Sequence, residues 1–159
     1  MAKSVFYSFH YQNDINRVMI VRNRWVTHGG QLISGVIDHA AFEKVQRQGD
    51  AAIKHWINSQ LNRTSVTVVL IGADTLNRHY VQYEICESLK RGNAVIGVYI
   101  HRLKDFYGRP SIACNQHTII GYYSDGAPAY FDNVAAGIYD YVIDDGYNNL
   151  GKWVDNAGI

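Results

Sequence analysis

The run of residues 65–72 constrains the fold most, because its sequence Ser-Val-Thr-Val-Val-Leu-Ile-Gly is almost entirely apolar and rich in β-branched side chains. A strand with one face in water alternates apolar and polar residues, whereas a parallel strand that is covered on both faces is apolar throughout. This segment is therefore predicted to be the central strand of a parallel sheet. Such a sheet needs helices on both of its faces.

Strands and helices are predicted to alternate along most of the chain. Stretches rich in β-formers or apolar residues predict strands at 5–9, 36–37, 94–100 and, as a last short strand, within 118–123. Apolar residues at spacings of three and four predict helices over about 15–28, 50–62, 77–91 and 131–142. Asp14 stands where an N-cap of the first helix would lie, and residues 144–146 would end the last helix.

This alternation predicts an α/β fold, because parallel neighbouring strands require right-handed crossover connections. We expect one domain over residues 1–159, with a central parallel sheet of four to five strands and helices on both faces. The length of 159 residues agrees with a single domain. Residues 102–117 contain Gly108 and Pro110 and show no sustained period, so they are predicted to form a surface loop.

Composition and charge exclude several classes of partner. Fifteen Lys and Arg residues against fourteen Asp and Glu give a net charge of +1, which creates no field to attract nucleic acid or an anionic membrane. No apolar run approaches the roughly 20 residues of a membrane span, and the N-terminus does not resemble a secretory signal. Two cysteines, Cys86 and Cys114, are too few for a disulfide framework. We therefore expect a soluble, cytoplasmic protein.

The loops at the carboxyl ends of the strands are the places to look for chemistry, since ligands of open α/β sheets bind there. These loops are 8–14, 38–42 and 72–78. The sequence lacks a G-x-G-x-x-G motif after the first strand, a Walker lysine loop and a G-x-S-x-G elbow, which disfavours dinucleotide oxidoreductases, P-loop NTPases and α/β-hydrolases. The seven histidines lack metal-ligand spacing, so no metal is expected. A phospho-receiver is also disfavoured, because the acidic residues it needs after the first and central strands are missing.

Two motifs resemble those of TIR domains. Residues 5–11, Val-Phe-Tyr-Ser-Phe-His-Tyr, resemble the first strand of that family, and residues 76–84 resemble its third helix, in which an aromatic residue precedes a glutamate by four positions. Here these two residues are Tyr80 and Glu84, although many TIR domains have tryptophan at the first position. Four segments together resemble the TIR-like proteins of Thoeris antiphage defence, namely 4–12, 21–27, 64–72 and 141–148.

The resemblance implies a flavodoxin-like, three-layer fold and an enzyme that cleaves NAD+. Such an enzyme releases nicotinamide and forms a cyclic or otherwise modified ADP-ribose, which activates a separate antiphage effector. NAD+ would be the substrate, no further cofactor is expected, and self-association into a homo-oligomer is a further expectation. The same fold also supports an alternative, a non-catalytic TIR adaptor that acts by self-assembly.

Glu84 is the candidate catalytic residue. Nicotinamide leaves a cationic pyridinium as a neutral molecule, so this reaction needs no general acid, unlike most glycoside hydrolysis. One carboxylate could stabilise the oxocarbenium-like transition state and hold the ribose hydroxyls. On the predicted helix Glu84 lies one turn beyond Tyr80, so the carboxylate and the ring would share one pocket. The pattern alone leaves open a solvated glutamate on the helix surface.

Five other residues are candidate substrate contacts, and each has a simpler structural explanation. Ser8 and His10 would contact the diphosphate or adenosine side of the substrate. The alternatives are that Ser8 only stabilises a turn and that His10 is an ordinary exposed histidine. Asp38 would lie in a loop over the pocket, or cap a turn or helix. Asn77 would contact the ligand or cap the third helix. Tyr80 would stack on nicotinamide or pack in the core.

Overall fold

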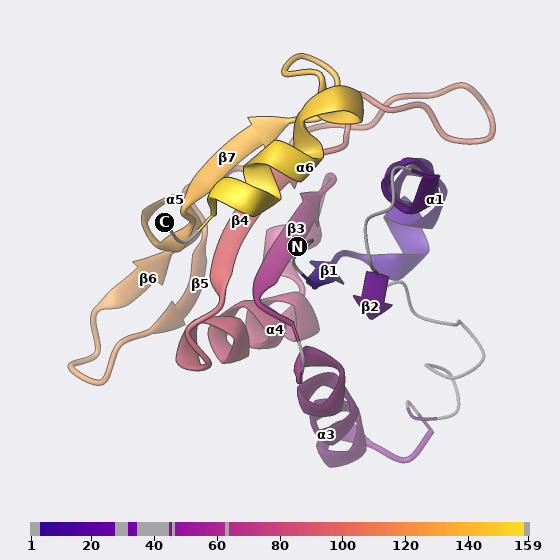
Figure 1. The fold of residues 1–159 in the computed structure, drawn as a ribbon. Coiled ribbons are helices and arrows are strands. Elements are labelled where there is room, and N and C mark those ends of the chain that lie inside the picture. Colours follow the sequence, from indigo (N-terminus) through magenta and orange to yellow (C-terminus); the bar gives the residue numbers. More distant parts are fainter. Residues whose placement is uncertain (1–3, 28–31, 35–44, 46, 63, 158–159) are drawn as a thin grey trace.

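The computed structural model describes residues 4–27, 32–34, 45, 47–62 and 64–157 (Figure 1). Within these residues, five parallel strands form the main sheet in the order β2-β1-β3-β4-β7. These strands are β1 (Val5–Ser8), β2 (Leu32–Ser34), β3 (Val66–Ile71), β4 (Ala94–Tyr99) and β7 (Gly137–Asp140). A separate antiparallel pair consists of β5 (Ile119–Tyr122) and β6 (Pro128–Tyr130).

Helices cover both faces of the main sheet, which confirms the predicted three-layer α/β fold (Figure 1). On one face lie α1 (Tyr11–Thr27) and α6 (Gly146–Asn156), which pack on a core cluster that includes Tyr7, Val68 and Leu70. The other face carries α3 (Asp50–Leu61), the 3-10 helix η1 (Thr75–Asn77), α4 (His79–Lys90) and the short α5 (Phe131–Val134). None of the described helices is long and apolar enough to cross a membrane.

Strand β3 is the central strand, as the sequence predicts. All six of its residues are buried, and it pairs with β1 on one side and β4 on the other. Its side chains alternate between the faces: Val68 and Leu70 join the cluster under α1 and α6, whereas Val69 and Ile71 join the cluster under α4. Burying each of these side chains fully stabilises the fold by about 1.5–3 kcal/mol.

The first helix begins earlier than predicted. Helix α1 starts at Tyr11, so Asp14 lies inside its first turn and is not its N-cap. The backbone N–H of Asn13 instead donates to Nδ1 of His10 at 3.4 Å, and the N–H of Asp14 donates to the carbonyl of His10. His10 therefore supplies the cap, and the Asp14 side chain is free to point toward the sheet.

The predicted helix over 131–142 is wrong in its second half. Only Phe131–Val134 is helical, and Gly137–Asp140 is the edge strand β7, parallel to β4. Residues spaced four apart, such as Val134 and Ile138, share a face in a strand as well as in a helix, so this spacing did not distinguish the two. Residues 144–146 do not end a helix, because Gly146 begins α6, which buries Leu150 and Val154.

Two of the predicted strands also differ from the structure. The strand predicted within 118–123 exists as β5, but it pairs antiparallel with β6 outside the main sheet. The second parallel strand lies at Leu32–Ser34, and the predicted strand 36–37 falls outside the described residues.

Candidate functional site

The strand order reverses between β1 and β3, which defines the switch point of the sheet. The chain leaves β1 after Ser8 and enters α1, which lies on one face. It leaves β3 after Ile71, passes through Gly72 and η1, and enters α4 on the opposite face. The crevice where α/β proteins bind ligands therefore lies beside Ser8 and Gly72.

Glu84 is buried at this switch point. It lies in α4, retains only 7% exposure, and its Oε1 accepts a hydrogen bond from the Ser8 hydroxyl at 3.3 Å. The alternative of a solvated helix-surface glutamate is therefore wrong. This hydrogen bond joins two residues that are 76 positions apart in the chain, so the fold itself brings the two candidates together.

Burial raises the pKa of Glu84 well above its ordinary value, and the hydrogen bond from Ser8 opposes that rise. Removing water from a carboxylate destabilises its charged form, whereas a donor hydrogen bond stabilises that form. A carboxylate in such surroundings interacts more strongly with a nearby positive charge than it would in water. A strongly perturbed acid at a switch point is a candidate for catalysis.

A chain of buried hydroxyl groups anchors the helical turn that carries Glu84. The Ser88 hydroxyl donates to the carbonyl oxygen of Glu84 at 2.7 Å, and it lies 2.6 Å from the Thr67 hydroxyl on β3. Both side chains are fully buried. Glu84 is thus tied to the sheet at its backbone through Thr67 and at its carboxylate through Ser8.

Tyr80 lies on the same face of the sheet as Glu84 but bonds to a different helix. Its hydroxyl donates to Asp50 Oδ1 at 2.8 Å, at the start of α3. Its ring packs against the cluster that contains Phe6, two residues before Ser8. The hydroxyl is therefore engaged with α3, and it is the ring that approaches β1.

The remaining sequence candidates lie around the β1–α1 turn and η1. His10 is buried, and burial followed by the nearby charge of Arg78 lowers its pKa below its ordinary value. Asn77 ends η1 and donates to Asp74 Oδ1 at 3.3 Å and to Cys114 Sγ at 3.9 Å. The prediction that Asn77 caps α4 is wrong, because Arg78 occupies the N-cap. Asp38 lies outside the described residues.

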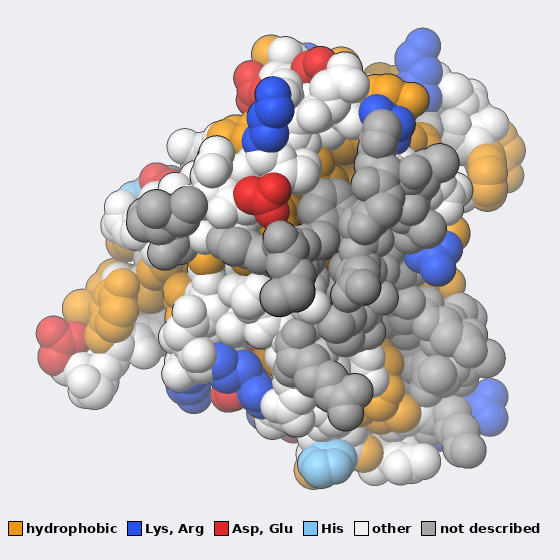
Figure 2. Space-filling model, in the orientation of Figure 1, with side chains coloured by type: hydrophobic (Ala, Val, Ile, Leu, Met, Phe, Trp, Pro, Cys, Tyr) orange, Lys and Arg blue, Asp and Glu red, His pale blue; other side chains and the backbone are white. Residues whose placement is uncertain are grey.

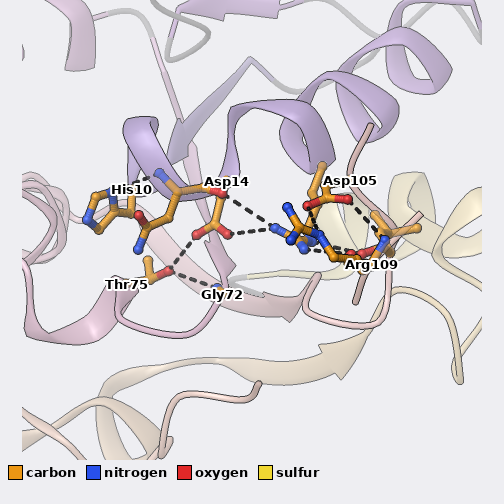
Figure 3. A network of polar contacts seen from close by, with 9 residues as sticks. His10, Asp14, Gly72, Thr75, Asp105 and Arg109 are labelled. Atoms are coloured by element: carbon orange, nitrogen blue, oxygen red, sulfur yellow. Dashed lines mark hydrogen bonds and ion pairs between the residues drawn. The ribbon is translucent and has the colours of Figure 1, made fainter. Parts of the chain in front are cut away.

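A second buried carboxylate, Asp14, lies in the first turn of α1 and points toward Thr75 and Gly72 after β3 (Figure 3). Its Oδ2 accepts a hydrogen bond from the Thr75 hydroxyl at 3.4 Å, and Thr75 accepts one from the N–H of Gly72 at 2.8 Å. Arg17 lies 3.6 Å from Asp14 Oδ1. A Cβ atom on residue 72 would overlap the carboxylate of Asp14, so the close approach of this side chain requires glycine there.

Sequence reasoning did not predict this network as part of the site. Asp14 looks like a helix cap in the sequence, and nothing in the spacing relates it to Thr75, which lies 61 positions away. The usable signal is Gly72, because a glycine directly after the central strand indicates close approach of another group.

The described residues contain no group of three or more His, Cys, Asp or Glu side chains that could hold a metal ion. On the face drawn in Figure 2, the described Lys and Arg side chains are scattered and do not gather in one patch. That distribution agrees with the net charge of +1.

Comparison with known proteins defines the class of this α/β protein. The family described as "Thoeris protein ThsB, TIR-like domain" matches residues 6–105, which include Ser8, Asp14, Thr75 and Glu84. The chain is also 39% identical to a Bacillus cereus (strain MSX-D12) protein named "Putative cyclic ADP-D-ribose synthase ThsB1". That alignment spans 192 positions and covers 98% of this chain and 100% of the relative. The chain belongs to the ThsB TIR-like family of Thoeris proteins.

Proposed function

We propose that this protein cleaves NAD+, releases nicotinamide and joins the remaining ADP-ribose to itself as a cyclic product. The observation that carries this proposal is the buried Glu84 carboxyl group, bonded to Ser8 at the switch point of the sheet. The name of the Bacillus cereus relative, "Putative cyclic ADP-D-ribose synthase ThsB1", supports the same reaction.

In this mechanism the bond between the nicotinamide nitrogen and ribose C1′ breaks first. The bonding electron pair goes to the pyridinium ring, so nicotinamide leaves neutral and the positive charge develops on the ribose. The ionised Glu84 carboxylate stabilises that charge in a site with little water, where a fixed charge acts most strongly. A nucleophilic atom of the adenosine part of the same molecule then attacks C1′, any proton it carries passes to solvent, and the new bond closes the cyclic product.

In this proposal Ser8 and Tyr80 prepare the surroundings of the Glu84 carboxylate. The Ser8 hydroxyl orients one carboxylate oxygen and favours its ionised form. The Tyr80 ring supplies an apolar wall on the same face of the sheet. His10, Asn77 and Asp38 stay predictions as contacts to the diphosphate or adenosine side of the substrate.

The proposal also includes the partners that the family implies. NAD+ is the substrate, no other cofactor takes part, and the cyclic product carries the signal to a separate effector protein. Self-association of the chain would complete the site in an assembled state.

The test is release of nicotinamide from NAD+ by the purified protein, with mass spectrometry of the products. The assay is run with and without lysate from phage-infected cells, so that an activating factor is supplied. Glu84→Gln keeps the shape of the side chain and removes its charge. Turnover should fall at least about 100-fold, which corresponds to roughly 2.7 kcal/mol of lost transition-state stabilisation.

Glu87→Gln is the matched control, because Glu87 lies one turn away in α4 and pairs with Lys90 at the surface. It should leave turnover unchanged. Glu84→Gln should also be at least as stable as the wild type at neutral pH, since the pKa of Glu84 is raised and its ionisation costs stability. Equal turnover of Glu84→Gln and wild type would remove Glu84 from the mechanism. Failure of the activated wild type to release nicotinamide would favour the non-catalytic adaptor.

A further inference from the structure

The position of Asp14 lowers the stability of the fold, because its charge is buried with incomplete hydrogen bonding. Its side chain is only 1% exposed, and its Oδ1 has no hydrogen-bond partner among the described residues. The nearest cation, Arg17, lies 3.6 Å from that oxygen, beyond hydrogen-bond distance. A buried ion pair with incomplete hydrogen bonding does not offset the loss of hydration. Burial accordingly raises the pKa of Asp14 to about 6, even though Arg17 and Thr75 act to lower it.

The same carboxylate joins segments from three parts of the chain (Figure 3). Thr75 links Asp14 to the backbone of Gly72, directly after β3. Arg17 links it to the segment after β4, because the guanidinium donates to the carbonyl oxygens of Leu103 at 2.8 Å and Arg109 at 2.9 Å. Asp14 therefore lies at the junction of the β1–α1 turn, the β3–α4 loop and the segment 103–109.

We propose that Asp14 is a positioning residue of the active site, whose ionised carboxylate fixes the β3–α4 loop through Thr75 and the segment 103–109 through Arg17. These segments leave the same edge of the sheet as Ser8, the partner of Glu84. The activity part of this inference rests on the proposed function, because its readout is nicotinamide release.

The stability cost argues that the charge serves function. An asparagine would have nearly the same shape, could accept the hydrogen bond from Thr75, and would avoid the burial of a charge. What asparagine lacks is attraction for Arg17. Groups that lower stability and lie at a ligand-binding edge are characteristic of functional sites.

The other charged groups around the network interact mainly with one another. From the β1–α1 turn this group is His10, and from the two ends of η1 they are Asp74 and Arg78. Besides burial, Arg78 lowers the pKa of His10 and Asp74 raises it. From the segment after β4 they are His101, Asp105 and Arg109. Arg17 lowers the pKa of His101 and of Asp105, in each case after larger causes. For Asp14 itself, the acting groups are Arg17 and Thr75.

The test compares the wild type with Asp14→Asn across pH. Protonated Asp14 and asparagine are both neutral, so the turnover of the two proteins should differ least at pH 5 and most above pH 7. The ratio of their turnover numbers at saturating NAD+ should rise about tenfold between pH 5 and pH 7.5, because a group with a pKa of about 6 is about one-tenth ionised at the lower pH. Titration of Glu84 affects both proteins and cancels in this ratio.

Thermal unfolding gives a readout that does not need enzyme activity. The folded-state pKa of Asp14 lies above its unfolded value, so its stabilising contribution is complete below the unfolded pKa and is lost as pH rises to about 6. Asp14→Asn avoids this loss. Its melting temperature should exceed that of the wild type, by a margin that grows from pH 4 to pH 6 and is constant above.

Two further variants complete the design. Thr75→Val removes the hydroxyl group and should lower turnover without the gain in melting temperature. Asp155→Asn removes an exposed carboxylate of α6 and should match the wild type in both assays. A turnover ratio that does not change with pH, or an Asp14→Asn variant that is less stable than wild type, would overturn the inference. An inactive wild type with the expected melting profile would refute the proposed function and leave the buried charge of Asp14 established.

Discussion

The two buried carboxylates near the switch point, Asp14 and Glu84, differ in the polar group that lies beside each of them. Asp14 is sealed at 1% exposure and has Arg17 beside it, whereas Glu84 keeps 7% exposure and is bonded to the neutral hydroxyl of Ser8. Burial raises the pKa of both groups. Among the described residues, Arg17 is the cation beside Asp14, whereas Glu84 is bonded only to a neutral hydroxyl. In the proposed reaction, the pyridinium of NAD+ supplies the cation that Glu84 lacks.

The strongest way to break this comparison is to bury a carboxylate with no partner at all. Val69 is fully buried in β3 and lies opposite Ser8 in the register of the sheet. Val69→Asp should cost several kcal/mol and abolish soluble folding, because the new charge would lie in the apolar cluster that Val69 forms with Ile71, Val81 and Ile85. Expression in the soluble fraction and circular dichroism are the measurements.

The same substitution at an exposed valine separates burial from side-chain type. Val142 is 48% exposed after β7, so Val142→Asp should express and melt like the wild type. A stable, well-folded Val69→Asp protein would show that β3 tolerates an unpartnered charge, and the partners of Asp14 and Glu84 would then lose their significance.

Removing the one partner of Glu84 sharpens the comparison. Ser8→Ala deletes the donor that favours ionised Glu84, so the pKa of Glu84 should rise further. In the proposed reaction turnover requires the ionised form of Glu84, so the rising limb of the pH profile should move to higher pH by about one unit, the value of a hydrogen bond to a charged group. Ser59→Ala, on the exposed side of α3, is the control. An unshifted profile would separate Ser8 from the ionisation of Glu84.

The smallest expected effect concerns the apolar wall beside Glu84. Tyr80→Ala should weaken the use of NAD+ more than it lowers stability, because the ring is half-buried and its hydroxyl contacts the exposed Asp50. Tyr80→Phe keeps the ring and should stay within about 0.5 kcal/mol of the wild type in stability. Both are followed by catalytic efficiency and thermal melting. Equal catalytic efficiency of a folded Tyr80→Ala variant would exclude the ring from the site.

The sequence predicts the parts of this fold whose pattern has one interpretation. The short, β-branched apolar run of β3 favours a strand covered on both faces, and the stripe of Ile53, Trp56, Ile57 and Leu61 favours a helix, because the spacing of three between Ile53 and Trp56 does not fit the two-residue period of a strand. Near the C-terminus, the four-residue spacing of Val134 and Ile138 fits both a helix and a strand. Tyr139 resolves the ambiguity in the structure, since it packs on the opposite face from Ile138.

The candidate site likewise has a part that the sequence predicts and a part that only the folded structure reveals. Glu84 was predicted through the resemblance of residues 76–84 to TIR domains, but its burial and its bond to Ser8 depend on the packing of α4 against β1. The Asp14 network joins residues distant in the chain through hydrogen bonds that leave no periodic pattern in the sequence. Such contacts are consequences of topology, and local propensity does not encode them.

The parallel topology of the sheet also determines when the site can assemble during folding. Ser8 and Glu84 are 76 residues apart, and every neighbouring pair in the main sheet is joined by a long crossover. Folding rates fall as contacts become less local, because the entropy of closing large loops is lost before the contacts form. A nascent chain that has not yet produced β7 leaves β4 as an unpaired edge, and the face beneath α6 stays uncovered until residues 146–156 emerge. The apolar face that α6 covers is therefore exposed until residues 146–156 have been synthesised, which makes the growing chain dependent on protection from aggregation until then.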